Sequence, residues 1–357
     1  MTADPGRATS AGPELLDAAR GGDDDAFRRI VEPHRQELHA HCYRMLGSVH
    51  DAEDAVQDTL LRAWRGLPRF EGRSSLRSWL YRIATNACLD RISQRPRRAL
   101  PVDHGPAAGQ HVGPGEPLAE STWVEPYPDE QQDLPAGYGS PEARYEQRES
   151  VELAFIVALQ RLPATQRAVL ILRDVLGFSA REVAETLATT VASANGALRR
   201  ARKAVAQVVP AQSQQANLRA LGDDGLRRLV ERYIDAWERG DVNAILAMLA
   251  EDATFSMPPL PTWYRGREAI EDFLIRFALH DRWRLLPTRA NGQLAFGAYA
   301  WEPERKSYTP LSLDVLTLDG TRARDVTSFV TPHTRGPDRQ RFAVEVFGRF
   351  GLPDHLD

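Results

Sequence analysis

Aromatic, cationic and amide side chains occur close together in one stretch of this chain. A turn from Leu67 to Ser75 carries Phe70 near its centre and leads into a predicted helix from Leu76 to Ser93. The apolar stripe expected to be buried on that helix is Leu76, Leu80, Ile83 and Ala87. The outward face then carries Tyr81, Arg82 and Asn86. Aromatic rings stack on bases, arginine pairs with phosphate and an amide hydrogen-bonds a base edge, so this face predicts contact with single-stranded DNA. Trp79 fits the core and the DNA-facing side equally well.

A second candidate surface closes a predicted helix-turn-helix. A helix from Gln166 to Leu176 stops at Gly177, and Ser179 with Glu182 forms the capping box of a short helix. A third helix follows, with Leu198, Ala201 and Val205 toward the core. Its residues available to DNA are Asn195, Gly196, Arg199, Arg200, Arg202 and Lys203. A helix in this position enters the major groove, and its arginines add phosphate contacts. Three packed helices with a basic end can also be a protein-binding bundle.

An amphipathic helix from Asp51 to Trp64 precedes the aromatic turn and must help to position it. Its apolar period puts Ala52, Ala55, Val56, Leu60, Ala63 and Trp64 inward. Its outward residues are Glu53, Asp54, Gln57, Asp58 and Arg62. A charge-rich helical face is most often only solvated, but its place beside a DNA-type surface makes this one a candidate docking face.

Composition limits the class of protein. With 357 residues and 42% hydrophobic residues, the chain can bury two or three ordinary cores, and we expect three domains. A net charge of -4 means that any DNA binding comes from local basic patches. Cys42 and Cys88 are too few for a disulfide framework, the opening residues lack a signal-peptide pattern, and no apolar run predicts a membrane span, so we expect a cytoplasmic protein.

The residue types change sharply after Arg98. From Ala99 to Ala143 there is no Lys or Arg, while prolines and carboxylates recur, as is typical of an extended acidic linker. The segment can be a plain spacer, but Trp123 and Tyr127 suggest that it lies on another surface. The expected organisation is a helical domain over residues 15–98, this linker over 99–143, a helical domain over 144–209 and a mixed domain over 223–352.

The two helical domains together resemble an extracytoplasmic-function (ECF) RNA polymerase sigma factor. The resemblance rests on the segments Asp51–Asp58 with Ala63-Trp64, Phe70–Ser75, Trp79–Asn86 and Leu162–Arg202, in this order. It implies two all-α DNA-binding domains, sigma region 2 and the helix-turn-helix of sigma region 4, which bind core RNA polymerase and promoter DNA.

The resemblance also implies roles for particular residues. Asp54, Gln57, Asp58 and Arg62 would contact the clamp helices of the polymerase β′ subunit, and region 4 would lie at the β flap. The loop with Phe70, Gly72, Arg73 and Ser74, together with Tyr81, Arg82 and Asn86, would bind the minus-10 element and capture an unstacked base. The six exposed residues of the last helix would bind the minus-35 element. The linker would thread the polymerase cleft, where its carboxylates can mimic phosphates in a positively charged channel.

The residues after Val209 extend beyond an ordinary sigma factor of this family. Apolar helical stripes precede strand-like runs at residues 283–287, 294–299, 311–318, 323–330 and 342–347. Helices followed by a curved antiparallel sheet predict an α+β cone. This unit resembles the SnoaL-like fold, and its fusion to a sigma factor resembles the SigG-like and SigJ-like subgroup.

A small-molecule pocket in the cone is a further candidate site. The residues expected there are Asp252, Met257, Trp263, Tyr264, His280 and Asn291, with Phe273 and Phe277 as further apolar lining. No acid–base spacing singles out a catalytic pair, so we expect a binding or structural role and no enzyme activity, cofactor or catalytic residue. His39, His41 and Cys42 lack the geometry and the fourth ligand of a zinc site, so no metal is expected.

The sequence thus predicts a sigma factor for promoter-specific initiation, with a C-terminal domain that modulates its activity. The alternative class is a helix-turn-helix regulator that binds duplex DNA without polymerase and carries a ligand-binding or catalytic tail. A third class is an enzyme whose turnover depends on Asp252 or His280.

Overall fold

The computed structural model of the chain describes residues 13–118, 122–129, 149–210, 212–330 and 344–357. They form two compact units. The first unit holds the described residues up to Arg97, Glu149 and Ser150, and Ala158–Val209; the second holds Arg98–Asp129, Val151–Val157 and the remainder to Asp357.

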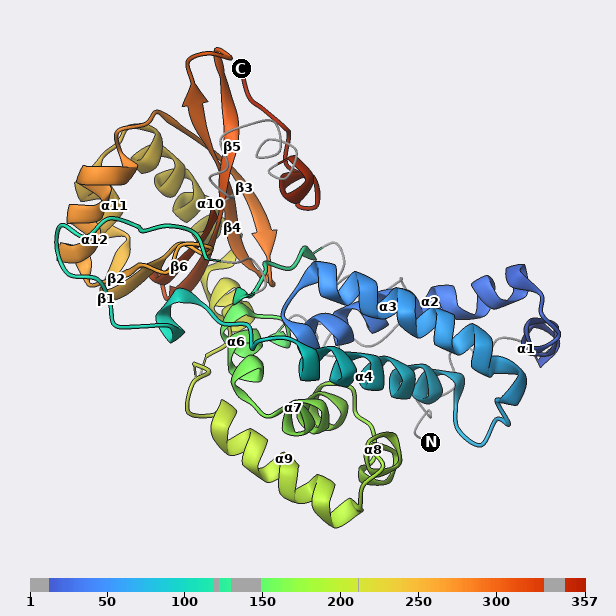
Figure 1. Ribbon diagram of the computed structural model, residues 1–357. Helices are drawn as coiled ribbons and strands as arrows, with labels where there is room; N and C mark the ends of the chain where they lie inside the picture. Colours follow the sequence, from blue (N-terminus) through green and yellow to red (C-terminus); the bar gives the residue numbers. More distant parts are fainter. Residues whose placement is uncertain (1–12, 119–121, 130–148, 211, 331–343) are drawn as a thin grey trace. The chain divides into compact units, whose positions relative to one another are not determined.

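The first unit begins with helices whose ends are fixed by local signals (Figure 1). Its elements are α1 (Pro13–Arg20), α2 (Asp24–Leu46), α3 (Val49–Gly66), the 3-10 turn η1 (Leu67–Arg69) and α4 (Leu76–Gln94). Ser48 and Ser75 cap α3 and α4 by accepting hydrogen bonds from the backbone N–H groups of Asp51 and Ser78. The left-handed Gly47 (φ 70°) ends α2 and lets α3 fold back onto it.

The second half of the first unit confirms the predicted helix-turn-helix. Only Ala158–Arg161 of α6 (Leu153–Arg161) belongs to this unit. The elements that follow are α7 (Ala164–Leu170), a π-helical turn η5 (Ile171–Val175), α8 (Ala180–Thr186) and α9 (Val191–Val205). The Ser179–Glu182 capping box is present, and Thr190 caps α9 by accepting from the backbone N–H of Ser193. The predicted single helix from Gln166 to Leu176 begins slightly earlier and finishes in the π turn.

The second unit is built on a curved six-stranded sheet in the order β2-β1-β6-β5-β4-β3. The strands are β1 (Leu249–Ser256), β2 (Trp263–Arg265), β3 (Trp283–Ala290), β4 (Gln293–Glu302), β5 (Ser307–Asp319) and β6 (Arg322–Val330). The expectation of a purely antiparallel sheet was wrong at one place, because β1 pairs with β6 in parallel. The strand expected over residues 342–347 was also wrong where the structure describes it, since residues 344–348 are helical.

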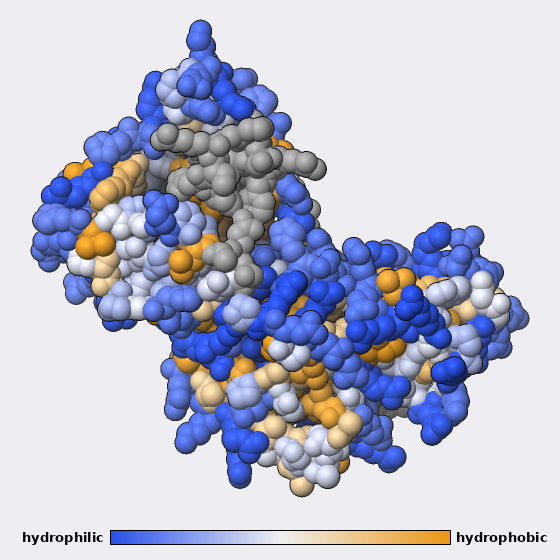
Figure 2. Space-filling view, in the orientation of Figure 1, coloured by the Kyte–Doolittle hydropathy of each residue, from blue (hydrophilic) through white to orange (hydrophobic). Residues whose placement is uncertain are grey.

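Helices fill the concave side of this sheet, and we call the sheet and these helices the cone. They are α10 (Gln214–Glu238), which kinks at Gly222, α11 (Val242–Ala247), α12 (Arg267–Phe273) and the π turn η6 (Leu274–Ala278) (Figure 1). Their apolar faces and the inner face of the sheet share one buried cluster. On the face drawn in Figure 2, hydrophilic residues predominate and apolar residues appear in small separate groups. Among the described residues, no helix has both the length and the apolar character that crossing a membrane requires.

The acidic linker, as far as Asp129, belongs to the second unit. Trp123 and Tyr127 are 3% and 0% exposed. The backbone of Tyr127 exchanges hydrogen bonds with Asn291, donating to its side-chain Oδ1 and accepting from its backbone N–H, both at 2.8 Å. The expectation that the linker lies on another surface is confirmed for Tyr127, and the surface is the cone; the ring of Trp123 packs on His104 within the linker itself. Glu130 and Asp133, two of the linker carboxylates expected to mimic phosphates in the polymerase cleft, lie outside the described residues.

Candidate functional site

The outward face of α3 carries the residues expected to dock on a partner. Asp54, Gln57 and Arg62 are exposed and Asp58 is half-buried, while Ala52, Ala55 and Ala63 are fully buried. Asp58 pairs with Arg62 at 2.9 Å one helical turn away. The predicted two sides of this helix are confirmed for these residues, whereas Glu53, Leu60 and Trp64 are half-buried.

Leu61 was missed on this face. Its side chain is 56% exposed, and its spacing of seven, four and three residues from Asp54, Gln57 and Asp58 puts all four on one helical face. A single exposed leucine is common on protein surfaces, but its place among the residues expected to dock makes this one a candidate contact. The i, i+3, i+4, i+7 spacing was the signal that could have revealed it.

A cavity of about 350 Å³ lies between the end of α3 and α4. Its lining residues are Arg62, Gly66, Arg69, Trp79, Ile83 and Asn86. Trp79 is buried and forms a wall, with its Cζ2 only 3.2 Å from where a Cβ on Gly66 would lie. Arg69 and Asn86 remain exposed at the cavity. The site therefore joins an aromatic surface, two guanidinium groups and one amide.

Two residues expected to face DNA are covered instead. Phe70 is buried, and its ring lies 4.9 Å from that of Trp79. Tyr81 is 1% exposed, donates its hydroxyl to Glu37 and packs edge-on against Phe178 from the turn before α8, at 5.4 Å between ring centroids. The expectation that Tyr81 faces outward was wrong because α4 packs against both α2 and α8, so its buried surface is broader than one stripe. Gly72, Arg73, Ser74 and Arg82 are exposed as expected.

A buried arginine fastens α7 to the end of α2. The Arg167 guanidinium is almost inaccessible and donates to the Met45 carbonyl at 2.5 Å and to Gln160 Oε1 at 2.6 Å. Burial lowers its pKa to about 10, so it is still charged at neutral pH. Gln160 in turn donates to the Arg44 carbonyl at 3.2 Å. These bonds hold the helix-turn-helix against the first helices within the first unit.

The basic surface of α9 is solvent-facing. Asn195, Arg199, Arg200, Arg202 and Lys203 are exposed and Gly196 is half-buried, while Ala194, Ala197, Leu198 and Ala201 form the buried side. Arg202 makes a bidentate ion pair with Asp174, with distances of 2.7 and 2.8 Å. A Cβ on Gly196 would meet only the Arg200 side chain, at 3.5 Å. Internal packing therefore does not require this glycine.

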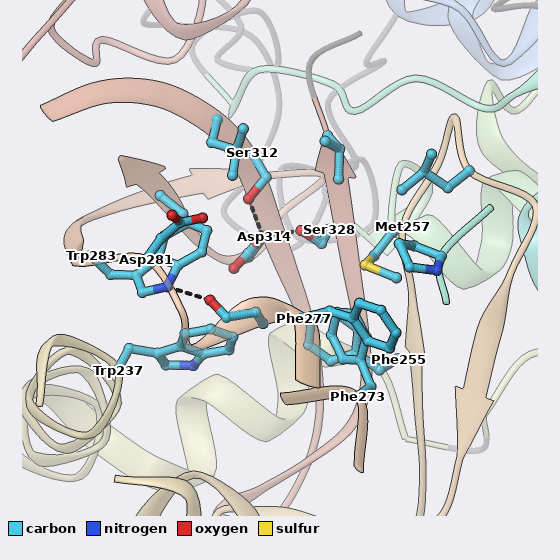
Figure 3. A pocket seen from close by; sticks show the side chains of 16 residues that line it. Trp237, Phe255, Met257, Phe273, Phe277, Asp281, Trp283, Ser312, Asp314 and Ser328 are labelled. Carbon is cyan, nitrogen blue, oxygen red and sulfur yellow. Dashed lines mark hydrogen bonds between the residues drawn. The ribbon is translucent and has the colours of Figure 1, made fainter. Parts of the chain in front are cut away.

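The cone contains a second cavity, of about 170 Å³ (Figure 3). Of the six residues expected to form a pocket, only Met257 lines it, joined by the predicted apolar residues Phe273 and Phe277. The other lining residues are Pro114, Trp237, Phe255, Leu260, Ala278, Asp281, Trp283, Ala298, Leu311, Ser312, Asp314, Ser328 and Val330.

The polar residues expected in this pocket are used elsewhere. Asp252 and His280 are exposed, and Asn291 is buried under the linker. Trp263 and Tyr264 donate to the carbonyls of Gly105 and Val112, both in the linker. Their expected places were wrong because residues 98–118 run along this side of the cone and take up these hydrogen-bonding groups.

Asp314 is the polar centre of the cavity, and the sequence reading missed it. Its side chain is 3% exposed, and its Oδ1 accepts hydrogen bonds from Ser312 at 2.9 Å and from Ser328 at 2.5 Å. Burial raises its pKa to about 6, and the two serine hydroxyls partly oppose that rise. The sequence did contain a signal for this residue, namely a carboxylate in the middle of the apolar run Leu311–Leu318. An aspartate is rarely buried in a strand unless it has a partner.

His41, weighed above as a zinc ligand, is a buried core residue. Its Nε2 lies 3.0 Å from Thr85 Oγ1, and burial, with Arg44 and Arg77 nearby, lowers its pKa to about 3. Within the described part of the chain, no three His, Cys, Asp or Glu side chains are placed to hold a metal ion.

Family models match three parts of the chain. Residues 30–98 match Sigma-70 region 2, residues 152–205 match Sigma-70 region 4, and residues 230–346 match the SnoaL-like domain. The first two matches contain α3, α4 and α9, and the third contains most of the cone.

Several proteins share this organisation. The chain is 39% identical over 353 residues to the ECF RNA polymerase sigma factor SigG of Mycobacterium tuberculosis, covering 98% of this chain and 89% of SigG. It is 29% identical over 248 residues to SigJ of the same organism, covering 69% of this chain and 70% of SigJ. The crystal structure of M. tuberculosis SigJ has the same fold, with a TM-score of 0.53, 23% identity and coverage of 87% of this chain and 96% of that one.

Proposed function

The chain belongs to the ECF RNA polymerase sigma factors, and from this membership we propose that it binds core polymerase through α3 and promoter DNA through α4 and α9. It directs promoter-specific initiation of transcription. It performs no chemistry of its own, and it works in the cytoplasm, where its partner transcribes DNA.

The cavity at the end of α3 carries the proposal for the minus-10 element. An unstacked base can enter it, stack against Trp79 and pair its edge with the Asn86 amide. Arg62 and Arg69 line the same cavity and can pair with the phosphate of the captured nucleotide. Capture of a flipped base in this cavity would couple recognition of the minus-10 element to melting.

The α3 face supplies the contact with polymerase. Leu61 gives an apolar centre, and Asp54, Gln57 and Asp58 surround it with groups that suit a basic partner surface, as the β′ clamp helices would offer. Region 4 lies at the β flap and presents the exposed side of α9 to the minus-35 element.

The covered state of Tyr81 supports a closed resting form of the first unit. While Phe178 packs on Tyr81 and Arg167 holds α7 to α2, DNA cannot reach this part of α4. Binding to core polymerase separates the two helical regions and exposes Tyr81 to the promoter.

The cone modulates this activity through the linker. The acidic group of Asp129 accepts a hydrogen bond from the Gly292 N–H at 2.7 Å and lies 3.5 Å from Arg289, so this carboxylate is occupied while the linker lies on the cone. A linker that threads the polymerase cleft must leave these partners. The cone thus competes with the polymerase for the linker.

Run-off transcription with purified core polymerase and the full chain tests the base-capture role. Replacing Asn86 with alanine should lower transcript yield by about fivefold to 150-fold, since a base-edge contact is worth about 1–3 kcal/mol. Gln94→Ala removes an exposed amide from the same helix and should leave the yield unchanged. Equal yields from both variants would contradict a role of Asn86 in base capture.

The same assay tests α9. Arg199→Ala should weaken initiation on promoters with an intact minus-35 element, whereas Arg29→Ala, an exposed arginine on α2, should not. A loss of yield that does not depend on the minus-35 sequence would point to a contact with phosphate or polymerase instead.

A further inference from the structure

The cavity of the cone is walled by aromatic rings. Trp237 from α10 and Trp283 from β3 lie on one side in Figure 3, and Phe255 from β1 and Phe273 from α12 lie on the other. The cavity is about 170 Å³, close to the roughly 150 Å³ of an engineered cavity that holds benzene. It therefore fits a ligand whose body is about one ring or a short hydrocarbon chain.

Asp314 provides one strong hydrogen-bond acceptor inside this apolar space. Both serine hydroxyls donate to its Oδ1. Its Oδ2 receives no hydrogen bond from any side chain that the structure describes. A buried carboxylate is costly unless a partner satisfies it, so an oxygen left free in a cavity indicates a ligand that donates to it.

The charges around the cavity identify the ligand's head group. Two carboxylates line the cavity, Asp314 inside and the exposed Asp281 nearby. Among the lining residues that the structure describes there is no Lys, Arg or His. Aromatic faces also attract cations, most strongly those of tryptophan. A cation satisfies both kinds of group, whereas an anion satisfies neither.

We propose that the cone binds a small organic amine in its ammonium form, with its apolar body between the aromatic walls and its ammonium group against Asp314. Nothing in this inference depends on promoter recognition, because the site lies wholly within the second unit.

Ser312 and Ser328 limit the rise in the pKa of Asp314, so that the carboxyl can pair with an ammonium ion. Burial raises the pKa of Asp314 to about 6, and without the two donating hydroxyls it would rise further. The carboxyl is therefore ionised at pH 7.5 and able to pair with an ammonium ion. Burial, together with the nearby Asp314 carboxylate, raises the pKa of Tyr233 in α10. In the part of the chain that the structure describes, Tyr233 and Asp281 are the other titratable side chains at this end of the cavity.

The linker forms part of the rim. Pro114 lines the cavity, a Cβ on Gly113 would lie 3.4 Å from the Phe277 ring, and the backbone N–H of His111 donates to Asp272 at 2.7 Å. A bound ligand would thus contact the segment that, in the proposed function, also threads the polymerase cleft; this link to polymerase rests on the proposed function, whereas amine binding does not. Ligand binding in the cavity would therefore change how firmly the linker is held on the cone.

Isothermal titration of the full chain with phenethylamine and with its neutral counterpart 2-phenylethanol tests the assignment. At pH 7.5 the amine should bind at least about tenfold more tightly, as expected for a charge-assisted hydrogen bond. Asp314→Asn should remove this preference. Asp319→Asn, an exposed carboxylate at the end of the same strand, should preserve it. No binding of phenethylamine at millimolar concentration, or equal binding of the two probes, would overturn the proposal.

The wild-type chain provides a test that needs no variant. Affinity for phenethylamine should fall as the pH drops through about 6 and then by about tenfold for each further pH unit, because the carboxyl becomes protonated. Affinity for 2-phenylethanol should change little. An amine affinity that stays constant between pH 7.5 and 5 would contradict pairing with Asp314.

Discussion

Asparagine in place of Asp314 should stabilise the cone at pH 7.5, and the gain should shrink as the pH falls. Burial raises the pKa of this carboxyl from its ordinary 3.8 to about 6. At about 1.4 kcal/mol for each pKa unit, the ionised carboxyl costs the folded cone about 3 kcal/mol. An amide of the same shape carries no charge but leaves its N–H groups without an acceptor in the cavity, so the expected gain is about 1–3 kcal/mol.

The sign of the pH dependence follows from the raised pKa. Below about pH 3.8 the carboxyl is protonated in both the folded and the unfolded chain, so it has no cost. Between pH 3.8 and 6 the unfolded chain loses its proton first, and the wild-type cone becomes less stable as the pH rises. Above about pH 6 the full cost is present. The advantage of the variant should therefore be largest above pH 6.

Hydrogen–deuterium exchange of the full chain measures this locally, since β4, β5 and β6 report on the cone alone. The ratio of wild-type to variant exchange rates at the same pH cancels the intrinsic effect of pH on exchange. This ratio should exceed one at pH 7.5 and fall about tenfold by pH 5, whereas Asp319→Asn should show a ratio near one throughout. A pH-independent ratio, or faster exchange in the variant at pH 7.5, would refute the reasoning.

Other changes test the packing, the charge and the capping of the two units. Gly297→Ala would put a Cβ 2.5 Å from Leu352 Cδ1 and should cost the cone about 1–3 kcal/mol by hydrogen exchange, whereas Gly348→Ala, which meets nothing within 4 Å, should cost little. His41 has its pKa lowered to about 3, so between pH 6.5 and 5 the first unit should lose about 1.6 kcal/mol more in the wild type than in His41→Gln; identical pH profiles of exchange would contradict a neutral buried ring. Ser179→Ala should weaken the start of α8 by about 1 kcal/mol, seen as faster amide exchange confined to that helix.

Local signals predicted most of the two helical regions. The Ser179–Glu182 box, the polar and apolar sides of α3 and the basic side of α9 could all be read correctly, because each depends on spacing within one helix. Tyr81 could not be placed in this way. Its burial depends on Phe178, which is far away in the sequence, and no periodicity within α4 records that contact.

The cavity of the cone shows the same limit. Met257 and Phe273 were predicted as apolar residues that line the cone, and both line the cavity. Asp252 and His280 were chosen for their chemistry, but the pleat of β1 and the end of η6 leave both exposed. Asp314 required knowledge of which face of β5 turns inward, and that is set by the register with its neighbouring strands.

The most direct test of the central claim is promoter-specific run-off transcription with and without core polymerase. The full chain should bind promoter DNA weakly by itself and should direct initiation from defined start sites once purified core enzyme is added. Tight, sequence-specific binding of duplex DNA by the chain alone, with no specific transcript after core is added, would contradict the account and favour a regulator that acts without polymerase.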